Sequence, residues 1–332
     1  MAPGNGGSVT IIDSNVNQVL LKGGNDNSNY TCTAYPSQCR GGDFNSVRSV
    51  VLTTINNSGG NGGGSGGTVT LTDSNVYSIN SDGTDGTSWG AGGAGGIINI
   101  FGSRVSRDIN SDGGPGLSGG SAGNLTSTYS YVSGLISLMG GNGSSGHGGA
   151  GGAAYVSDSN FISIFVNGGN TEDMGSSGGS CGNVVIFNSN FDSVESLGGW
   201  GMISGGSGGD VNISNSTLDS VISRGGEGDY GAVSGGTVRL TNSIADIINM
   251  GIDFSSYYGY PPNSGNVIIT DSTINQIYAQ GASTIAWTSG SNGGSVVFDP
   301  CPNSVPFVSV LAGTGTESSG SDGTITPSDC HS

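Results

Sequence analysis

The chain has few basic residues. Its 332 residues include 7 Lys and Arg against 24 Asp and Glu, which gives a net charge of −17. We therefore expect no nucleic-acid partner, because phosphate binding needs clustered basic side chains. An anionic membrane surface is disfavoured for the same reason. We also expect no membrane insertion, because no apolar run approaches the roughly 18 residues that a spanning helix needs.

Apolar residues are scarce as well. Only 33% of the chain is hydrophobic, and 67 residues are glycine. A chain of this composition would not normally build one round core. Low hydrophobicity with a high net charge is also typical of disordered chains. The regular placement of Val, Ile and Leu argues against disorder here.

Cysteine is a third scarce residue, with five in the chain. Cys32 and Cys39 enclose a short loop, and Cys301 and Cys330 enclose the tail of the chain. We predict that both pairs form disulfides outside the regular coils, and that Cys181 is a small buried residue. Few cysteines, an acidic surface and abundant Ser, Thr, Asn and Gly favour an extracellular, cell-surface or virion-surface location.

One pattern recurs along most of the chain: Gly-Gly-x-Val-x-Ile-x-Asp/Asn-Ser-x-Val-x-x-Ile. Copies start 27 to 30 residues apart, except for one gap of 60 residues, in which residues 41–60 form a degenerate copy. A fixed period of this size predicts a solenoid whose core is a thin column. A serine follows the second glycine at a constant distance in each copy: Ser14, Ser74, Ser103, Ser130, Ser159, Ser189, Ser216, Ser243 and Ser272.

Each copy predicts two strands and two corners. Alternating apolar residues such as Val69 and Leu71 mark a strand with one face inward, and Val76 and Ile79 anchor a second strand. The Asx-Ser pair between them favours a compact turn, and a glycine such as Gly83 ends the second strand. We expect the serine hydroxyl to donate to one coil and accept from the next, as a structural ladder. A nucleophile would occur once, beside a base.

The remaining arc of each coil is rich in Gly and Ser, and it often carries one large apolar residue, such as Leu117, Met174 or Ile203. These side chains either point inward and complete the core, or form an exposed row suited to stacking on sugar rings. On the second interpretation, the predicted ligand-binding residues are Trp89, Trp200, Tyr230, Tyr258 and Trp287.

The repeats resemble the right-handed parallel β-helix of bacterial adhesins, phage and virus fibres and pectin-lyase-like enzymes. More narrowly, they are similar to glycine-rich β-strand repeat proteins of microbial and viral surfaces. The resemblance covers roughly residues 6–300. It implies an all-β solenoid, for which we expect about eleven coils. We expect repeats over residues 1–298, with an irregular insert at 25–40, and a non-repeating tail or cap over 299–332.

The best cluster of chemical groups is acidic. Asp192, Asp219 and Asp246 occupy the same position in successive copies, which would stack their carboxylates. We interpret them as a solvated stripe. A weak calcium site is the second interpretation. Catalysis is the third, because no basic residue accompanies these carboxylates. Otherwise we expect no cofactor.

These features favour a non-enzymatic structural subunit of an extracellular or virion-surface fibre. Its tail would dock on the open end of a second copy, so that subunits join head to tail. Lateral association of subunits is the alternative form of oligomer. The alternative is an adhesin module that binds a cell-surface glycan through the aromatic row and loop 25–40. A polysaccharide-degrading β-helix enzyme is the third possibility.

Overall fold

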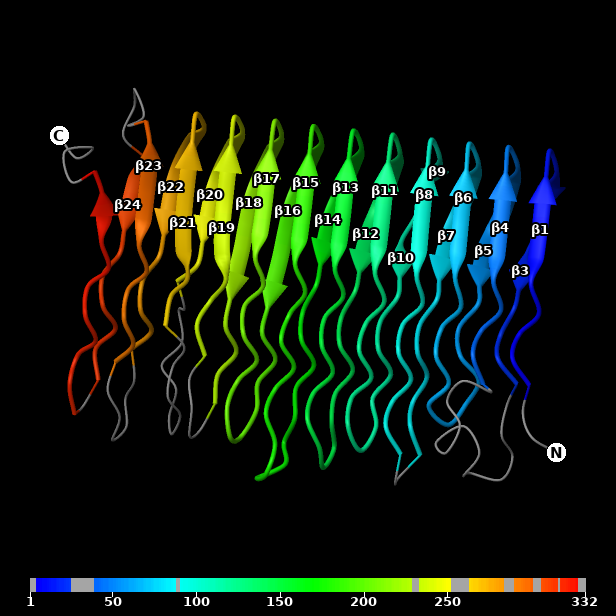
Figure 1. Cartoon of the computed structure of the whole chain (residues 1–332), viewed down its shortest axis with the longest axis horizontal. Coiled ribbons are helices and arrows are strands. Elements are labelled where there is room, and N and C mark those ends of the chain that lie inside the picture. The colour runs from blue at the N-terminus through cyan, green and yellow to red at the C-terminus, as the bar shows by residue number, and fades with distance from the viewer. Residues whose placement is uncertain are drawn as a thin grey trace.

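The computed structural model describes residues 4–24, 39–87, 90–228, 233–251, 263–283, 290–300, 306–315 and 317–327. The chain is an all-β parallel solenoid, as predicted, and its coils follow one another along a rod in chain order (Figure 1). In the described part of the chain, no helix has the length and apolar character needed to cross a membrane.

Two parallel sheets run along the rod, one of 12 strands and one of 13. The first sheet contains β1 (Val9–Ile12), β4 (Phe44–Val47), β6 (Val69–Thr72), β8 (Ile98–Phe101), β11 (Leu125–Thr128), β13 (Ala154–Ser157), β15 (Val184–Phe187), β17 (Val211–Ser214), β19 (Thr237–Thr241), β21 (Asn266–Thr270), β23 (Val296–Asp299) and β25 (Ile325–Thr326). We name each coil by its strand in this sheet.

The second sheet contains β2 (Asn15–Val16), β3 (Val19–Leu20), β5 (Val50–Asn56), β7 (Asn75–Asn80), β9 (Arg104–Val105), β10 (Ile109–Asn110), β12 (Tyr131–Ser137), β14 (Asn160–Phe165), β16 (Asn190–Leu197), β18 (Thr217–Arg224), β20 (Ile244–Asn249), β22 (Thr273–Tyr278) and β24 (Phe307–Ser309). In the β8 coil, the second strand is split into β9 and β10.

About nine turns carry the regular pair of strands, from the β4 coil to the β21 coil, which is slightly fewer than the predicted eleven. The count is lower because the strands of the end coils are short: β2, β3 and β25 have 2 residues each and β24 has 3. The tail nevertheless continues both sheets, since β24 pairs with β22 and β25 pairs with β23.

The core is one apolar column along the rod. Val69 and Leu71 of β6 are fully buried, and their register partners on β8, Ile98 and Ile100, are also fully buried. The same alternation recurs from coil to coil, so each inward side chain packs on its counterparts above and below. The predicted period-two strands therefore account for the core.

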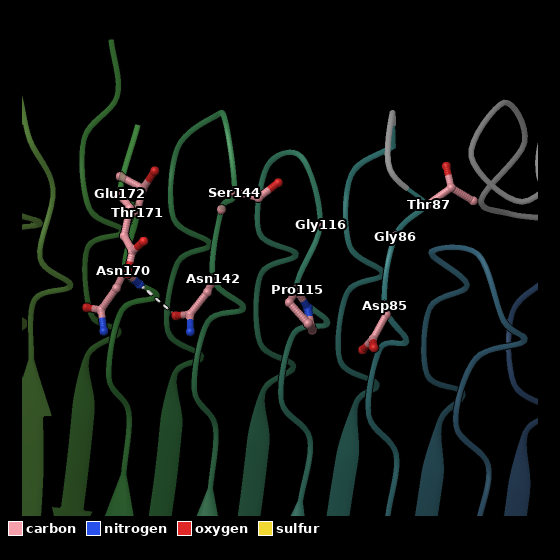
Figure 2. A pocket seen from close by; sticks show the side chains of 11 residues that line it. Asp85, Gly86, Thr87, Pro115, Gly116, Asn142, Ser144, Asn170, Thr171 and Glu172 are labelled. Atoms are coloured by element: carbon pink, nitrogen blue, oxygen red, sulfur yellow. Dashed lines mark hydrogen bonds between the residues drawn. The ribbon is translucent and has the colours of Figure 1, made fainter. Parts of the chain in front are cut away.

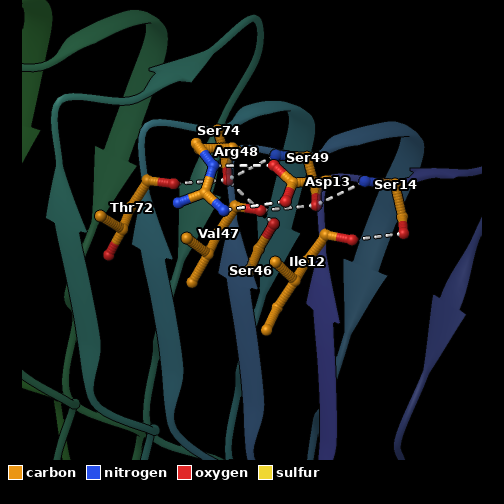
Figure 3. Close-up of polar contacts among 9 residues, drawn as sticks. All are labelled: Ile12, Asp13, Ser14, Ser46, Val47, Arg48, Ser49, Thr72 and Ser74. Carbon is orange, nitrogen blue, oxygen red and sulfur yellow. Dashed lines mark hydrogen bonds and ion pairs between the residues drawn. The ribbon is translucent and has the colours of Figure 1, made fainter.

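The first corner, between the two strands of a coil, passes through a left-handed residue. Its φ is 48° at Asp73 and 47° at Asn188. Asp and Asn tolerate this conformation better than other non-glycine residues, which explains the Asx of the repeat. Arg48 and Tyr129 occupy the same position, with φ of 46° and 50°. Arg48 donates from Nε to the carboxylate of Asp13 in the preceding coil, at 2.7 Å (Figure 3).

The residue after the left-handed one is a serine in each coil, and these serines form a hydrogen-bonded ladder along the rod. The Oγ of Ser74 donates to the carbonyl of Thr72 at 2.7 Å and accepts the N–H of Ser49 at 3.2 Å (Figure 3). Ser49 lies in the degenerate copy and belongs to the ladder, which continues to Ser272. Each hydroxyl thus donates within its own coil and accepts from the neighbouring coil, in agreement with the predicted ladder. The left-handed turn brings the carbonyl two residues back within reach.

Candidate functional site

A groove runs along the rod beyond the end of the second sheet, and we call it the glycine groove. Three adjoining hollows of about 640, 600 and 490 Å³ make it up, and they share lining residues. It extends from Lys22 to Leu197. Glycine pairs such as Gly140-Gly141 form its floor. A Cβ on Gly141 would lie 2.1 Å from the carbonyl oxygen of Gly114, so the tight corner admits no side chain there.

Two columns of outward side chains border this floor. The wall on the side of the second sheet includes Ser58, Asp82, Asp112, Met139, Asn167 and Leu197. The wall on the side of the arcs includes Asn61, Asp85, Pro115, Asn142 and Asn170. Figure 2 shows Asp85, Pro115, Asn142 and Asn170 in line on successive coils. Each wall therefore offers one side chain per coil, with a spacing of roughly 4.8 Å.

The amides of the arc-side wall have a fixed orientation. The Oδ1 of Asn142 accepts the N–H of Asn170 at 2.9 Å (Figure 2). The Oδ1 of Asn170 accepts the N–H of Trp200 at 2.7 Å. Within the described residues, neither amide nitrogen has a protein partner. Because both oxygens are engaged along the rod, the NH₂ groups remain available to a ligand.

Carboxylates dominate the N-terminal half of the groove. The N–H of Asp112 donates to Oδ1 of Asp82 at 2.9 Å, and the N–H of Met139 donates to Oδ1 of Asp112 at 2.7 Å. Burial raises the pKa of Asp82 to about 6; the N–H of Asp112 lowers it in part, and the Asp112 carboxylate raises it further. Asp85 and Glu172 also line the groove. This acidic lining disfavours an anionic ligand and suits an uncharged one.

The predicted aromatic row lies mostly outside the described residues. Trp89, Tyr230, Tyr258 and Trp287 fall there, so the row stays a prediction. Trp200 is half-buried, at the end of the arc-side column.

The inward-plug interpretation of the arc residues is wrong for two of them. The exposed fraction is 79% for Met174 and 42% for Ile203, whereas Leu117 is half-buried. The glycine corners bring the arc backbones close together, which leaves no internal space for these side chains.

The predicted acidic stripe lies on the outer face of the second sheet. Asp192, Asp219 and Asp246 are exposed on adjacent strands in register. Asn275 donates from Nδ2 to the carboxylate of Asp246 at 2.9 Å. Among the described residues, which include these three, no group of three or more His, Cys, Asp or Glu side chains is arranged to hold a metal ion. The calcium interpretation of the stripe stays a prediction.

The cysteines are only partly described. Cys181 is buried, as predicted, and its thiol donates to the carbonyl of Ser207 at 3.1 Å. Burial raises the pKa of this thiol. Cys39 is fully buried, while Cys32, Cys301 and Cys330 lie outside the described residues. Both disulfides remain predictions.

The groove residues were missed from the sequence, because the repeat was aligned on its apolar positions. The available signal was a second column of polar residues, each two positions after the glycine that ends the second strand: Asn61, Asp85, Asn142 and Asn170. No protein-family model, curated protein or solved structure matches the chain. A solenoid can carry many functions, so the function has to be inferred from the surface.

Proposed function

We propose that the protein is a non-enzymatic structural rod, a section of an extracellular or virion-surface fibre. The observation that supports this most directly is that the repeated positions all bond one coil to the next. The serine ladder, the glycine corners and the core column each run along the axis. Stability is then a sum of contacts between neighbouring coils, which suits a long rigid shaft.

The subunits join head to tail in this proposal. In the described residues, β1 pairs only with β4, and β25 pairs only with β23. An unpaired strand edge is a template for another strand. Every pairing along the rod is parallel, so a second copy stacked in the same orientation would continue both sheets with the same strand direction.

Electron microscopy of the purified protein, with and without calcium, tests the polymer. We expect filaments whose axial repeat matches the rod length. Discrete short rods under both conditions would contradict it.

A substitution in β1 tests the joint. Val9 and Asp13 donate their N–H groups to the β4 coil, at 2.9 and 3.1 Å, so the alternating Thr10 turns its N–H to the free edge. Thr10→Pro removes this donor without breaking a bond inside the rod. Filaments should be lost in Thr10→Pro and kept in the control Thr10→Val. Equal filament lengths in the two variants would exclude β1 as the joint.

A second candidate function, glycan binding, is supported by the glycine groove. The groove is open and uninterrupted over several coils, and Asn142 and Asn170 offer amide donors on two adjacent coils. This arrangement suits a linear, uncharged polysaccharide that lies along the rod, with affinity that grows with chain length.

Isosteric variants test the groove with neutral oligosaccharides of increasing length. In Asn142→Asp and Asn170→Asp, the oxygen that accepts a backbone N–H remains and the amide donor is lost. The control is Asn124→Asp, an exposed residue whose Oδ1 accepts the N–H of Ala153 at 2.9 Å. Loss of binding in the control as well would contradict the proposal that the oligosaccharide binds in the glycine groove. Shortened oligosaccharides would indicate an enzyme, in which Asp82 has the raised pKa of a general acid.

A further inference from the structure

Two neighbouring coils depart from the repeat at the first corner. At the left-handed position, Asx is replaced by Gly102 in the β8 coil and by Tyr129 in the β11 coil. Two residues later stand Arg104 and Tyr131, at a position that holds Asn in some coils, such as Asn75 and Asn160, and Val, Thr or Ile in others. Residues that the fold requires recur from coil to coil in a solenoid. Gly102, Tyr129, Arg104 and Tyr131 thus lie together at one corner, and other coils form the same corner with other residues, so the fold itself does not require these four.

These departures form a hollow of about 450 Å³, which we call the corner pocket. Gly102 lies at its base, because a Cβ there would approach the Oδ1 of Asp73 to 2.5 Å. Asp73 and Asp158 line it from the coils on either side of the two that depart from the repeat. The pocket lies at the first corner, where the chain passes from the first sheet to the second, and it shares no lining residue with the glycine groove.

The aromatic rings of the corner pocket face solvent. The exposed fraction is 71% for Tyr129 and 42% for Tyr131. The guanidinium carbon of Arg104 lies 4.9 Å from the ring centroid of Tyr131. In the described part of the chain, Arg104 forms no ion pair. Stacking on Tyr131 therefore holds a guanidinium whose donors are available.

This combination of groups is matched to a sugar. Tyrosine faces pack on the apolar C–H faces of a sugar ring, Arg104 donates to its oxygens, and the carboxylates of Asp73 and Asp158 accept from its hydroxyls. Two carboxylates against one guanidinium disfavour an acidic sugar. We propose that the corner pocket binds a short neutral saccharide, independently of the glycine groove and of fibre formation.

The test measures binding of a panel of neutral mono- and disaccharides, and of the corresponding uronic acids, by isothermal titration calorimetry. Tyr129→Asn, Tyr131→Asn and Arg104→Asn each introduce a residue that other coils carry at the same position, such as Asn188, Asn160 or Asn75. These variants are therefore expected to fold. Each should lose about tenfold or more in affinity, which corresponds to one lost stacking or charged hydrogen-bonding contact.

The control is Tyr155→Thr, at an exposed tyrosine on the outer face of β13 that pairs with Thr126 of β11. Its affinity should equal that of the unmodified protein. Absence of binding across the panel, or equal losses in Tyr129→Asn and Tyr155→Thr, would overturn the proposal. Tighter binding of uronic acids would overturn the neutral class. Affinity that grows with chain length and falls in Asn142→Asp would assign the binding to the groove instead.

Discussion

The N–H of Ser130 donates to the Oγ of Ser159 in the next coil, at 3.0 Å. Ser159 repeats this contact with Ser189 at 3.1 Å, and it donates its own hydroxyl proton to the carbonyl of Ser157 at 2.7 Å. The serines are buried, so water does not replace these bonds. One hydroxyl thus satisfies a backbone donor of one coil and a backbone acceptor of another.

Removal of one hydroxyl should destabilise the rod. In Ser159→Ala, the buried N–H of Ser130 and the carbonyl of Ser157 both lose a partner. We expect the free energy of unfolding to fall by about 1–3 kcal/mol. Denaturant unfolding measures it, with Ser144→Ala as the control. Ser144 is exposed in the arc, and its change should stay within about 0.5 kcal/mol. Equal midpoints for the two variants would show that the ladder adds no stability.

The glycine corners should be at least as sensitive to substitution as the serine ladder. A Cβ on Gly141 would lie 2.1 Å from one backbone atom and 2.5 Å from another, and backbone cannot move aside easily. Gly141→Ala should therefore cost about 1–3 kcal/mol or more, as in other overpacked sites. Gly7 is the matched control, because an added Cβ there meets nothing within 4 Å. If Gly7→Ala and Gly141→Ala lower the free energy of unfolding equally, the close approach of neighbouring backbones does not explain the glycine pairs.

Repetition determined what the sequence could predict. The strands, the inward residues such as Val69 and Leu71, and the corner serine recur in phase, so their roles followed from alignment. The carbonyl to which each serine hydroxyl donates could not be predicted, because it comes within reach only through the left-handed turn that precedes the serine. The corner pocket was missed for the opposite reason: Tyr129 breaks the repeat and Arg104 lies at a variable position, so an alignment gives neither of them a role. Met174 was uncertain from the start, since the arcs vary in length.

Tyr129 should reduce the stability of the corner that it occupies. It has φ of 50°, which is unfavourable for an aromatic residue, and most of its side chain is exposed. Tyr129→Asn should raise the free energy of unfolding by about 0.5–1 kcal/mol, because asparagine tolerates this conformation. Tyr131→Asn, outside the left-handed position, should give no such gain. A loss of stability in Tyr129→Asn would mean that the ring packs favourably, and would remove the argument that it is retained for binding.

Asp82 should make the rod less stable as the pH rises through the weakly acidic range. Its pKa is about 6 in the folded protein and 3.8 in the reference state, so between these values the folded chain binds more protons than the unfolded chain. The free energy of unfolding then falls as the pH increases from about 4 to about 6, by at most about 3 kcal/mol.

Asp82→Asn keeps an oxygen for the N–H of Asp112 and removes the charge. We expect this variant to be more stable than the unmodified protein at pH 7 and to lose that advantage at pH 4. Asp85→Asn, which removes a negative charge at an exposed position of the same groove, is the control. Comparison of variants at each pH cancels the carboxylates common to all of them, including Asp43, whose pKa is lowered by its hydrogen bond with Arg40. A constant difference between Asp82→Asn and the unmodified protein across this range would show that Asp82 ionises alike in the folded and unfolded chains.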